Sequence, residues 1–585
     1  MRRKKNMSSA YKLCGKRLFI SIIIGGFPIA GFSASPDAAL PGALEPRLEE
    51  KPKFNKRKQQ LIQPTPVEAI TAAPDDDVPR LKVTKFELTG TTNRPSLGID
   101  IAELNHIIEL IRKDSEHGFT IEDLRHVTTT ITTYYRSKGL FLARAFVPEQ
   151  RIKDGIVKIQ ILESNFESIE IEENKSYKNQ QILKPFNALL NQPIEKESIE
   201  NALLKLNDYP GLQTSNVFTP GKQQGAAILK VQVRNEQKLR SSVNIDNHGS
   251  EFAGRYRYHF NGQLNNPTYN TDKLTFNLLF SGKPGATGNS LYGNTNYEFP
   301  LVPFDLFFGS GYSQNKYKIG NFLSRLDFNG KSKIANIYLK KYFVRKRHFN
   351  LQTIAQFAHK YSEVISGQAS TNRDRLSVFN LGLVIKNTDK LGNNILSLTA
   401  YRGVGGFFGA MNEYDGTSSR ANASGSFGKY RLDYSRIQPL FRLFDSDFFN
   451  NQYLLIRSQG LYSADPLVSL EQMIVGGPNS VRAYPVAQAL MDKVGFFSLE
   501  WIAKSSVMTN VSWLQALQFS TFFDYAKGYR NQSIRNEDGS ISLTGTGLGM
   551  MLINNKGFNV KTELAMPIGD DSLSPKFYFS LSYNF

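Results

Sequence analysis

Cysteine and long apolar segments are scarce in this chain of 585 residues. The single cysteine, Cys14, lies near the N-terminus, so the rest of the chain carries no thiol that an oxidising compartment such as the periplasm could modify. The only continuous apolar run is Leu18 to Phe32, and the mean hydropathy is -0.34. Such a polar chain is not a bundle of membrane-spanning helices, and it is too long for one ordinary domain.

Motifs of catalysis and of cofactor binding are also missing. There is no Gly-x-Ser-x-Gly turn of a serine hydrolase, no His-Glu-x-x-His zinc helix and no phosphate-binding loop that ends in Gly-Lys-Ser/Thr. The seven histidines are scattered without the spacing of metal ligands. The Gly-rich stretches 403–409 and 545–549 are better interpreted as turns or crowded strands than as nucleotide sites. We therefore expect no enzyme activity, no metal, no cofactor and no nucleic-acid partner.

The N-terminal run has the layout of a secretory signal peptide. Seven basic residues precede it and small residues follow at 33–35, which predicts a signal peptide over residues 1–34. An anchor helix is the alternative, but Gly25, Gly26 and Pro28 interrupt a run that is already short of the ~20 residues of a full span. Removal of these residues takes seven positive charges from a formal net charge of +19 and leaves +12. A basic surface suits the phosphates of outer-membrane lipopolysaccharide.

Residues 36–80 have the composition of a linker, with prolines, a cluster of lysines and the acidic run 75–77. From Leu81 the pattern changes to a first α+β unit over residues 81–164. Its expected order is strand, helix, helix, strand, strand, with strands over 82–89, 141–147 and 155–162 and helices over 101–113 and 121–137. Thr120 is the expected N-cap of the second helix.

A second, less regular unit of the same type is expected over residues 165–236. The periodicity predicts a strand over 166–172, helices over 177–190 and 196–206, and a final strand over 226–233. Prolines and glycines at 210–211, 220–221 and 225 interrupt the segment before this last strand.

Residues 237–585 are rich in Tyr, Phe, Asn, Ser and Gly and alternate repeatedly between apolar and polar positions. Membrane strands need about 9 to 11 residues each, so about 16 antiparallel strands with their loops would use this length in a closed membrane β-barrel. A large soluble β-sandwich is the alternative. The last strand argues for the barrel: aromatic or apolar residues recur at every second position up to the end of the chain, at Phe577, Phe579, Leu581, Tyr583 and Phe585.

One loop stands out, because it sets a lone arginine between apolar residues in a region that otherwise indicates a membrane barrel. The stretch Gly476 to Tyr484 contains Val481, Arg482, Ala483 and Tyr484. A charge in or near a bilayer is costly, so we expect Arg482 to face the lumen and to pair with a carboxylate.

The partner that the sequence offers lies about forty residues further on. Asp524 follows Phe522 and Phe523 in a strand-like run, and Glu500 is a possible second carboxylate. We expect Arg482 to bind Asp524 in a bidentate manner, which would tether the loop around 470–490 inside the barrel. Tyr484 is expected to pack beside the arginine.

These segments resemble the paired motifs of the two-partner secretion transporters, a branch of the POTRA-barrel superfamily. The loop motif there is usually Val-Arg-Gly-Tyr or Val-Arg-Gly-Phe, and the strand motif is Phe-x-Asp-x-Gly. Here Ala483 and Ala526 stand in place of both glycines, which puts the close backbone approach in doubt. The sequences from Ser137 to Phe141 and from Pro148 to Gln150 are similar to those of a POTRA domain of this branch.

The resemblance implies a fold and a function. It implies two periplasmic POTRA domains, a helix within residues 36–80 that occupies the barrel lumen, and a C-terminal assembly signal that ends at Phe585. The chain would then be an outer-membrane transporter that captures an unfolded, β-helical exoprotein in the periplasm and passes it through the barrel. Its other partners would be the barrel assembly machinery, periplasmic chaperones and outer-membrane lipid. The alternative is an assembly factor of the same superfamily that inserts other barrels, although such factors typically carry more than two POTRA domains.

Overall fold

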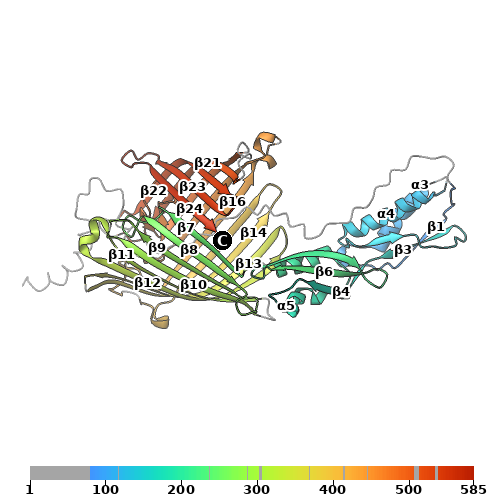
Figure 1. Ribbon diagram of the computed structural model, residues 1–585, viewed down its shortest axis with the longest axis horizontal. Coiled ribbons are helices and arrows are strands. Elements are labelled where there is room, and N and C mark those ends of the chain that lie inside the picture. The colour runs from blue at the N-terminus through green and yellow to red at the C-terminus, as the bar shows by residue number, and fades with distance from the viewer. Residues whose placement is uncertain are drawn as a thin grey trace, which may run out of the picture.

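The structure is a computed structural model that describes two small α+β units followed by a barrel (Figure 1). The described residues are 79–585 except 116–117, 191, 236–237, 286, 302–305, 368, 413–414, 445, 506–512 and 534–537. The expected signal peptide and lumenal helix lie outside the described residues. No helix of the described part is both long and apolar enough to span a membrane.

The first unit is a three-stranded sheet with two helices. Strand β3 lies in the centre, parallel to β1 and antiparallel to β2. The elements are β1 Lys85–Thr89, η2 Pro95–Leu97, α3 Ile101–Asp114, α4 Ile121–Ser137, β2 Arg144–Phe146 and β3 Ile156–Leu162.

Local sequence explains the ends of these elements. The Thr120 hydroxyl accepts a hydrogen bond from the Asp123 N–H at 3.1 Å, and the Asp123 carboxylate accepts one from the Thr120 N–H at 2.8 Å, so the predicted N-cap is confirmed as a capping box. The strand expected over 141–147 is shorter than predicted, because the Ala143 N–H bonds the carbonyl of Leu140 in a turn that delays β2 until Arg144.

The second unit repeats this arrangement, with β6 between β4 and β5. Its elements are β4 Asn165–Glu172, α5 Asn179–Leu183, η3 Lys184–Leu189, α6 Lys196–Asn207, β5 Leu212–Pro220 and β6 Ala226–Asn235. Two predictions were wrong here. The single helix over 177–190 is a short α-helix followed by a 3-10 turn, because Pro185 lacks the N–H that an α-helix needs. Strand β5 was missed, since its prolines and glycines mark its two ends.

The barrel closes with sixteen antiparallel strands in the described part of the chain. Closure is made by β24 against β7, which lie side by side although they are the last and first strands of the barrel (Figure 1). The strands are β7 Leu239–Asp246, β8 Tyr256–Asn265, β9 Lys273–Gly282, β10 Asn289–Leu301, β11 Leu306–Lys318, β12 Phe328–Arg345, β13 Phe349–Ser366, β14 Ala369–Thr388, β15 Asn393–Gly403, β16 Phe427–Pro439, β17 Gln452–Ser463, β20 Lys493–Ser505, β21 Leu514–Tyr529, β22 Ser540–Asn554, β23 Phe558–Pro567 and β24 Lys576–Asn584.

Ion pairs join the second α+β unit to one end of the barrel, which we call the proximal end. Asp208, just after α6, accepts hydrogen bonds from Arg345 at the end of β12, with an Nη2 to Oδ1 distance of 2.6 Å. Lys346 reaches Glu197 of α6 at 2.6 Å. The opposite, distal end carries the turns that follow β7, β9, β11, β13, β15, β17, β21 and β23. The short helices η4 Asn321–Leu326 and η5 Phe407–Gly409 lie in these distal turns, whereas η6 Leu440–Arg442 and η7 Asp447–Phe449 lie at the proximal end.

Candidate functional site

The distal connection between β17 and β20, residues 464–492, folds back into the barrel and is called here the lumenal loop. It contains a small hairpin of β18 Met473–Val475 and β19 Ala489–Met491, and most of its side chains are buried. The apolar cluster inside the barrel combines loop residues with inward side chains of the wall: Leu376, Val378, Phe427, Leu461, Val475, Val481, Met491, Phe496, Phe522 and Tyr578. The loop therefore packs against the inner wall of the barrel, and the two share one apolar core.

The tip of the lumenal loop is a tight turn that presents Arg482. Gly476 and Gly477 both have positive φ, of 94° and 96°, a backbone conformation that a residue with a Cβ adopts only at a cost. The turn is closed by the Gly477 N–H on the carbonyl of Val481 and by the Tyr484 N–H on the same carbonyl. The guanidinium of Arg482 then points into the barrel wall, where the residue is only 1% exposed.

Asp524 of β21 binds Arg482 with both carboxylate oxygens. Arg482 Nε donates to Oδ2 at 2.8 Å and Nη2 donates to Oδ1 at 2.9 Å, which is the bidentate geometry that favours arginine over lysine. The backbone N–H of Arg482 also donates to Oδ2 at 3.2 Å. The carboxylate thus holds both the side chain and the backbone of the loop tip.

Two further carboxylates bind the remaining terminal nitrogen. Arg482 Nη1 donates to Glu500 Oε2 of β20 at 3.0 Å and to Glu563 Oε1 of β23 at 2.7 Å. Lys561 lies on the other side of Glu563, with its Nζ 2.9 Å from the same oxygen. One arginine of the loop is therefore connected to three wall strands, and Lys561 adds a second cation to the group of three carboxylates.

An aromatic ring completes the arginine site. The guanidinium carbon lies 3.3 Å from the centre of the Phe522 ring, so the planar cation stacks on the ring face. A Cβ placed at Gly547 would lie 2.4 Å from Cζ of this ring, so the ring takes the space that a side chain at 547 would occupy. A Cβ at Gly545 would similarly lie 2.7 Å from the methyl group of Ala483.

The contact at Gly545 answers the doubt raised by Ala483. Neither Ala483 nor Ala526 has a positive φ, and both are fully buried. The extra methyl group of Ala483 is accommodated by the missing side chain of Gly545 on β22. Loop and wall therefore approach closely through an alanine on the loop and a glycine on the wall.

Electrostatics favour the charged form of the arginine despite its burial. Burial alone would lower the pKa of Arg482, but the hydrogen bonds and charge of Asp524, together with Glu500 and Glu563, raise this pKa above its ordinary value. Removal of the arginine is costly, because the three buried carboxylates would then lose the charge that compensates them.

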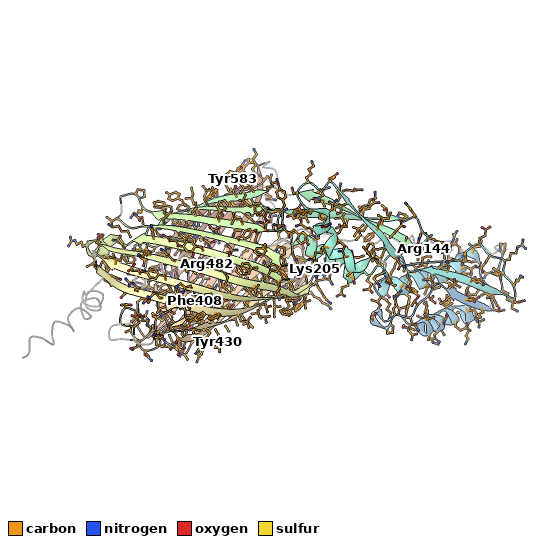
Figure 2. The ribbon with its side chains drawn as sticks, turned by 90° about the horizontal axis from the view of Figure 1, so that it is seen from below. Arg144, Lys205, Phe408, Tyr430, Arg482 and Tyr583 are labelled. Carbon is orange, nitrogen blue, oxygen red and sulfur yellow. The ribbon has the colours of Figure 1, made fainter. Side chains whose placement is uncertain are left out.

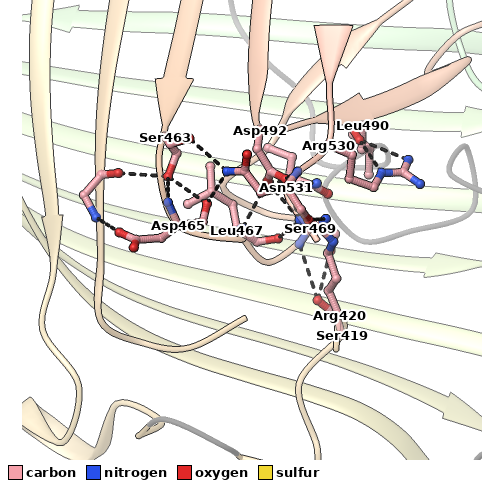
Figure 3. A network of polar contacts seen from close by, with 12 residues as sticks. Ser419, Arg420, Ser463, Asp465, Leu467, Ser469, Leu490, Asp492, Arg530 and Asn531 are labelled. Atoms are coloured by element: carbon pink, nitrogen blue, oxygen red, sulfur yellow. Dashed lines mark hydrogen bonds and ion pairs between the residues drawn. The ribbon is translucent and has the colours of Figure 1, made fainter. Parts of the chain in front are cut away.

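The base of the lumenal loop is held by a second buried pair (Figure 3). Asp492, which is fully buried, accepts from Arg420 Nη1 at 2.7 Å, from the Asn531 N–H at 2.7 Å and from the Leu467 N–H at 3.0 Å. Arg420 also donates to the carbonyl oxygens of Leu467 and Asn531. This network ties the two ends of the loop to the distal turns after β15 and β21.

A third buried carboxylate, Glu471, lies in the first part of the loop. Lys360 of β13 donates to its Oε1 at 2.7 Å, and Nζ of Lys429 of β16 lies 2.5 Å from its Oε2. Burial would raise the pKa of Glu471, but these two lysines lower it to about 2. The loop is thus fixed near its base to β13 and β16, which are other strands than the three that hold its tip.

The structure brings together most of the residues singled out in the sequence. Arg482, Asp524, Glu500 and Phe522 meet at one point (Figure 2 labels Arg482 within the barrel). Tyr484 lies beside the turn, where its carbonyl accepts a hydrogen bond from the Tyr578 hydroxyl at 3.4 Å, and the ring stacked on the arginine is that of Phe522.

Sequence reasoning missed Glu563 and the pairs at the base of the loop. Glu563 lies 81 positions from Arg482, and only the strand register, which places β23 beside β22, could have brought the two together. Strand β24 and the residue that follows it carry the terminal aromatics: Phe577, Tyr583 and Phe585 are exposed, and the rings of the last two lie 4.6 Å apart. Within the described residues, no group of three or more His, Cys, Asp or Glu side chains could hold a metal ion.

Comparison with known proteins agrees with this geometry. Residues 225–552 match the haemolysin secretion/activation proteins ShlB/FhaC/HecB, and residues 81–164 match the ShlB-type POTRA domain. The chain is 26% identical over 524 residues to the heme/hemopexin transporter protein HuxB of Haemophilus influenzae strain 86-028NP, covering 86% of this chain and 87% of that protein. It is 22% identical over 528 residues to the outer membrane transporter CdiB of Dickeya dadantii strain 3937, covering 87% and 88%.

The fold is also that of a solved transporter. CdiB from Escherichia coli superposes with a TM-score of 0.66 and 18% identity, over 88% of this chain and 93% of that chain. This family consists of transporters and is not a class of enzymes. Since the family match covers more than half of the chain, the protein belongs to the ShlB/FhaC/HecB family and is an outer-membrane transporter of the two-partner secretion type, with its POTRA region in the periplasm and its distal turns outside the cell.

Proposed function

We propose that this transporter exports one large, β-helical partner exoprotein and that the Arg482 site acts as a releasable tether of the lumenal loop. The observation that carries this proposal is the attachment of one loop arginine to carboxylates on three wall strands, at distances of 2.7 to 3.0 Å. In this position the loop occupies the lumen that the exoprotein must cross. Transport then requires the tip to leave its place.

The chemistry of the site suits a tether that opens and closes again. Charged hydrogen bonds are directional, so the tip returns to one position, and a hydrated lumen can solvate the charges once the contacts open. The ion pairs therefore give the loop a defined closed position without a permanent seal.

Capture of the exoprotein is assigned to an edge of the second α+β unit. The sheet order leaves β4 and β5 as edges. Strand β4 carries Glu167, Glu170 and Glu172, whereas β5 has nine residues, no charged side chain, and an exposed Val217. A long uncharged edge is suited to the addition of an incoming strand, because main-chain hydrogen bonds give affinity without demanding one sequence.

Other parts of the chain have roles that follow from the same proposal. Residues 1–34 would direct export to the periplasm, and 36–80 would supply the linker and lumenal helix. The α+β units would span 81–164 and 165–236, and the barrel would span 237–585. Phe585, together with Tyr583 and Phe579, would be read by the barrel assembly machinery after periplasmic chaperones deliver the chain.

The test compares the secreted and outer-membrane proteins of cells that carry the wild-type chain, no chain, or the Arg482→Ala variant. Loss of one large secreted protein without the chain, with other barrels unchanged, supports a dedicated exporter. A general fall in outer-membrane barrels contradicts it and indicates an assembly factor. An Arg482→Ala chain that assembles normally and still secretes at the wild-type rate would remove the tether from the proposal.

A further inference from the structure

The outer wall of the barrel carries an apolar groove that the transport function does not use. The groove crosses β14 to β17, has a volume of about 780 Å³, and is lined by Leu381, Leu398, Ala400, Tyr430, Leu432, Gly460 and Tyr462. These side chains face outward: Leu381 is 60% exposed and Tyr430 64%. The small residues Ala400 and Gly460 form its floor between the larger side chains.

The strand register shows why the groove lies at this place. Ala400 pairs with Tyr430, which pairs with Tyr462, and in the next outward row Leu432 pairs with Gly460, which pairs with Gly495. A Cβ at Gly495 would meet no atom within 4 Å, so the floor continues openly onto β20. The two tyrosines thus stand beside a strip of wall with few side-chain atoms.

Three basic side chains surround the extracellular end of the groove. Lys493 Nζ lies 5.4 Å from the centre of the Tyr462 ring, and Lys527 is outward on β21 beside Gly495. Arg402, also exposed, pairs with Gly428 at the end of β15, and its Nη1 lies 3.8 Å from where a Cβ of Gly428 would be. Within the described residues none of the three forms a salt bridge. The groove therefore has an apolar body and an uncompensated cationic rim.

An aromatic loop extends the other wall of the groove. Phe379 pairs with Arg402 across β14 and β15, and its ring lies 5.7 Å from that of Phe407. The loop after β15 is held against the outside of the barrel, because the Ser377 hydroxyl donates to the Phe407 carbonyl at 2.7 Å. Phe408, labelled with Tyr430 in Figure 2, is 72% exposed. An exposed pair of phenylalanines on the outside of the barrel is stable in lipid and costly in water.

We propose that this groove binds a phosphorylated, multi-acyl lipid of the outer leaflet, the lipid A part of lipopolysaccharide. The acyl chains would lie along Ala400 and Gly460, and the phosphates would contact Arg402, Lys493 and Lys527. The charges argue for this occupant over a second barrel, because the cations at the rim would attract phosphates and would repel the same cations of another copy. Several phosphates match several cations better than a single phospholipid headgroup does.

The other wall of the barrel provides a matched comparison. Lys316, Lys318 and Lys331 also lie outward at the extracellular end, around a smaller groove of about 430 Å³. There, however, Lys318 is paired with Asp327 at 3.1 Å and Lys331 with Glu363 at 2.7 Å. Removal of these three lysines changes the net charge as much as removal of Arg402, Lys493 and Lys527, but takes away cations that are largely neutralised.

The experiment measures binding of bisphosphorylated lipid A to the full-length protein in phosphatidylcholine nanodiscs, with phosphatidylglycerol as the single-phosphate comparison. Each cation near an anionic lipid is worth about fivefold in affinity, so Arg402→Gln/Lys493→Gln/Lys527→Gln should weaken lipid A binding about a hundredfold. The control Lys316→Gln/Lys318→Gln/Lys331→Gln should lose about fivefold at most, because Lys318 and Lys331 are already paired with carboxylates. Ala400→Trp, which fills the groove and keeps its charges, should also weaken binding.

Three results would overturn the proposal. The first is equal lipid A binding by the wild type and the charge-removed variant. The second is stronger binding of phosphatidylglycerol than of lipid A, which would assign the groove to a phospholipid. The third is a dimer in nanodiscs or mild detergent that Ala400→Trp dissociates, which would make the groove an interface between copies of the chain. Heat-modifiable migration of each variant on gels establishes that the barrels are folded.

Discussion

Removal of the guanidinium in Arg482→Ala should release the tip of the lumenal loop while the barrel stays closed. The side chain donates two hydrogen bonds to Asp524 and one each to Glu500 and Glu563. Without it, three buried carboxylates face one another, with Lys561 still 2.9 Å from Glu563. Breaking a buried pair from one side costs about 3 to 5 kcal/mol, and the lower end applies here because lumenal water can reach the freed groups.

A loss of about 3 kcal/mol changes the population of the released tip about a hundredfold, since every 1.4 kcal/mol is a factor of ten. Ser480 is a suitable reporter: it is 5% exposed, and its hydroxyl has no hydrogen-bond partner among the described residues. In cells that make Ser480→Cys, we expect slow reaction with a membrane-impermeant maleimide. Addition of Arg482→Ala should speed this reaction by about the same hundredfold.

Two controls separate release of the tip from general loosening. Arg442→Ala removes an exposed arginine of a proximal turn and should leave labelling at Ser480→Cys unchanged. Asp524→Asn combined with Arg482→Ala should label more slowly than Arg482→Ala alone, because one of the stranded charges is gone. If Arg482→Ala labels no faster than its parent, the ion pairs do not hold the loop, and the reasoning from burial and geometry is refuted.

Three further predictions concern the surroundings of this site. Gly545→Ala should displace the loop tip and lower the free energy of unfolding by about 1 to 3 kcal/mol in thermal unfolding, because the new methyl group would lie 2.7 Å from that of Ala483. The double variant Gly545→Ala/Ala483→Gly should recover most of this lost stability. Gly495→Ala, whose methyl group would meet no atom within 4 Å, should leave the stability unchanged. The pKa of Glu471 is lowered from 4.5 to about 2, so its contribution to stability is fully present above pH 4.5 and is lost as the pH falls towards 2. Glu471→Gln should therefore reduce the loss of unfolding free energy between pH 4.5 and pH 2. An unchanged loss over this pH range would contradict the ion-pair assignment. Asp208→Ala removes both carboxylate acceptors of Arg345 and should increase hydrogen exchange in the second POTRA unit by about tenfold, whereas loss of the exposed carboxylate in Glu197→Ala should change it little.

The sequence was most informative where a residue acts through a short pattern. The capping box at Thr120, the two helices of the first POTRA unit and the alternation of the last strand depend on neighbours within a few positions, so periodicity was sufficient. Arg482 and Asp524 were found because a lone charge in an apolar setting requires a partner. Glu563 and the Asp492 network could not be found in this way, because their contacts depend on which strands become neighbours when the barrel closes.

The need to know which segments become neighbours also explains why the sequence pattern could not account for Ala483 and Ala526. A sequence pattern that expects glycine at 483 and 526 treats each position by itself, whereas the packing constraint is shared between the loop and the wall. The structure meets that constraint with Gly545, which lies 62 positions from Ala483 and opposite it in space. Replacement of one small residue by another across a contact leaves the fit unchanged, although the local motif is altered.

The two sets of contacts along the lumenal loop differ in a way that defines how it could move. At the base, Asp492 accepts hydrogen bonds from the Leu467 and Asn531 backbones as well as from Arg420, so the loop ends are joined to each other and to neighbouring turns. At the tip, the backbone contributes two bonds, from the Arg482 N–H and to the Tyr484 carbonyl, and most of the others belong to the side chain of Arg482. A passing polypeptide therefore meets a segment whose tip can be detached by the separation of one guanidinium from its carboxylates, while its base remains fixed. Movement of the tip about the base, with return to the same three carboxylates, follows from this unequal distribution of bonds.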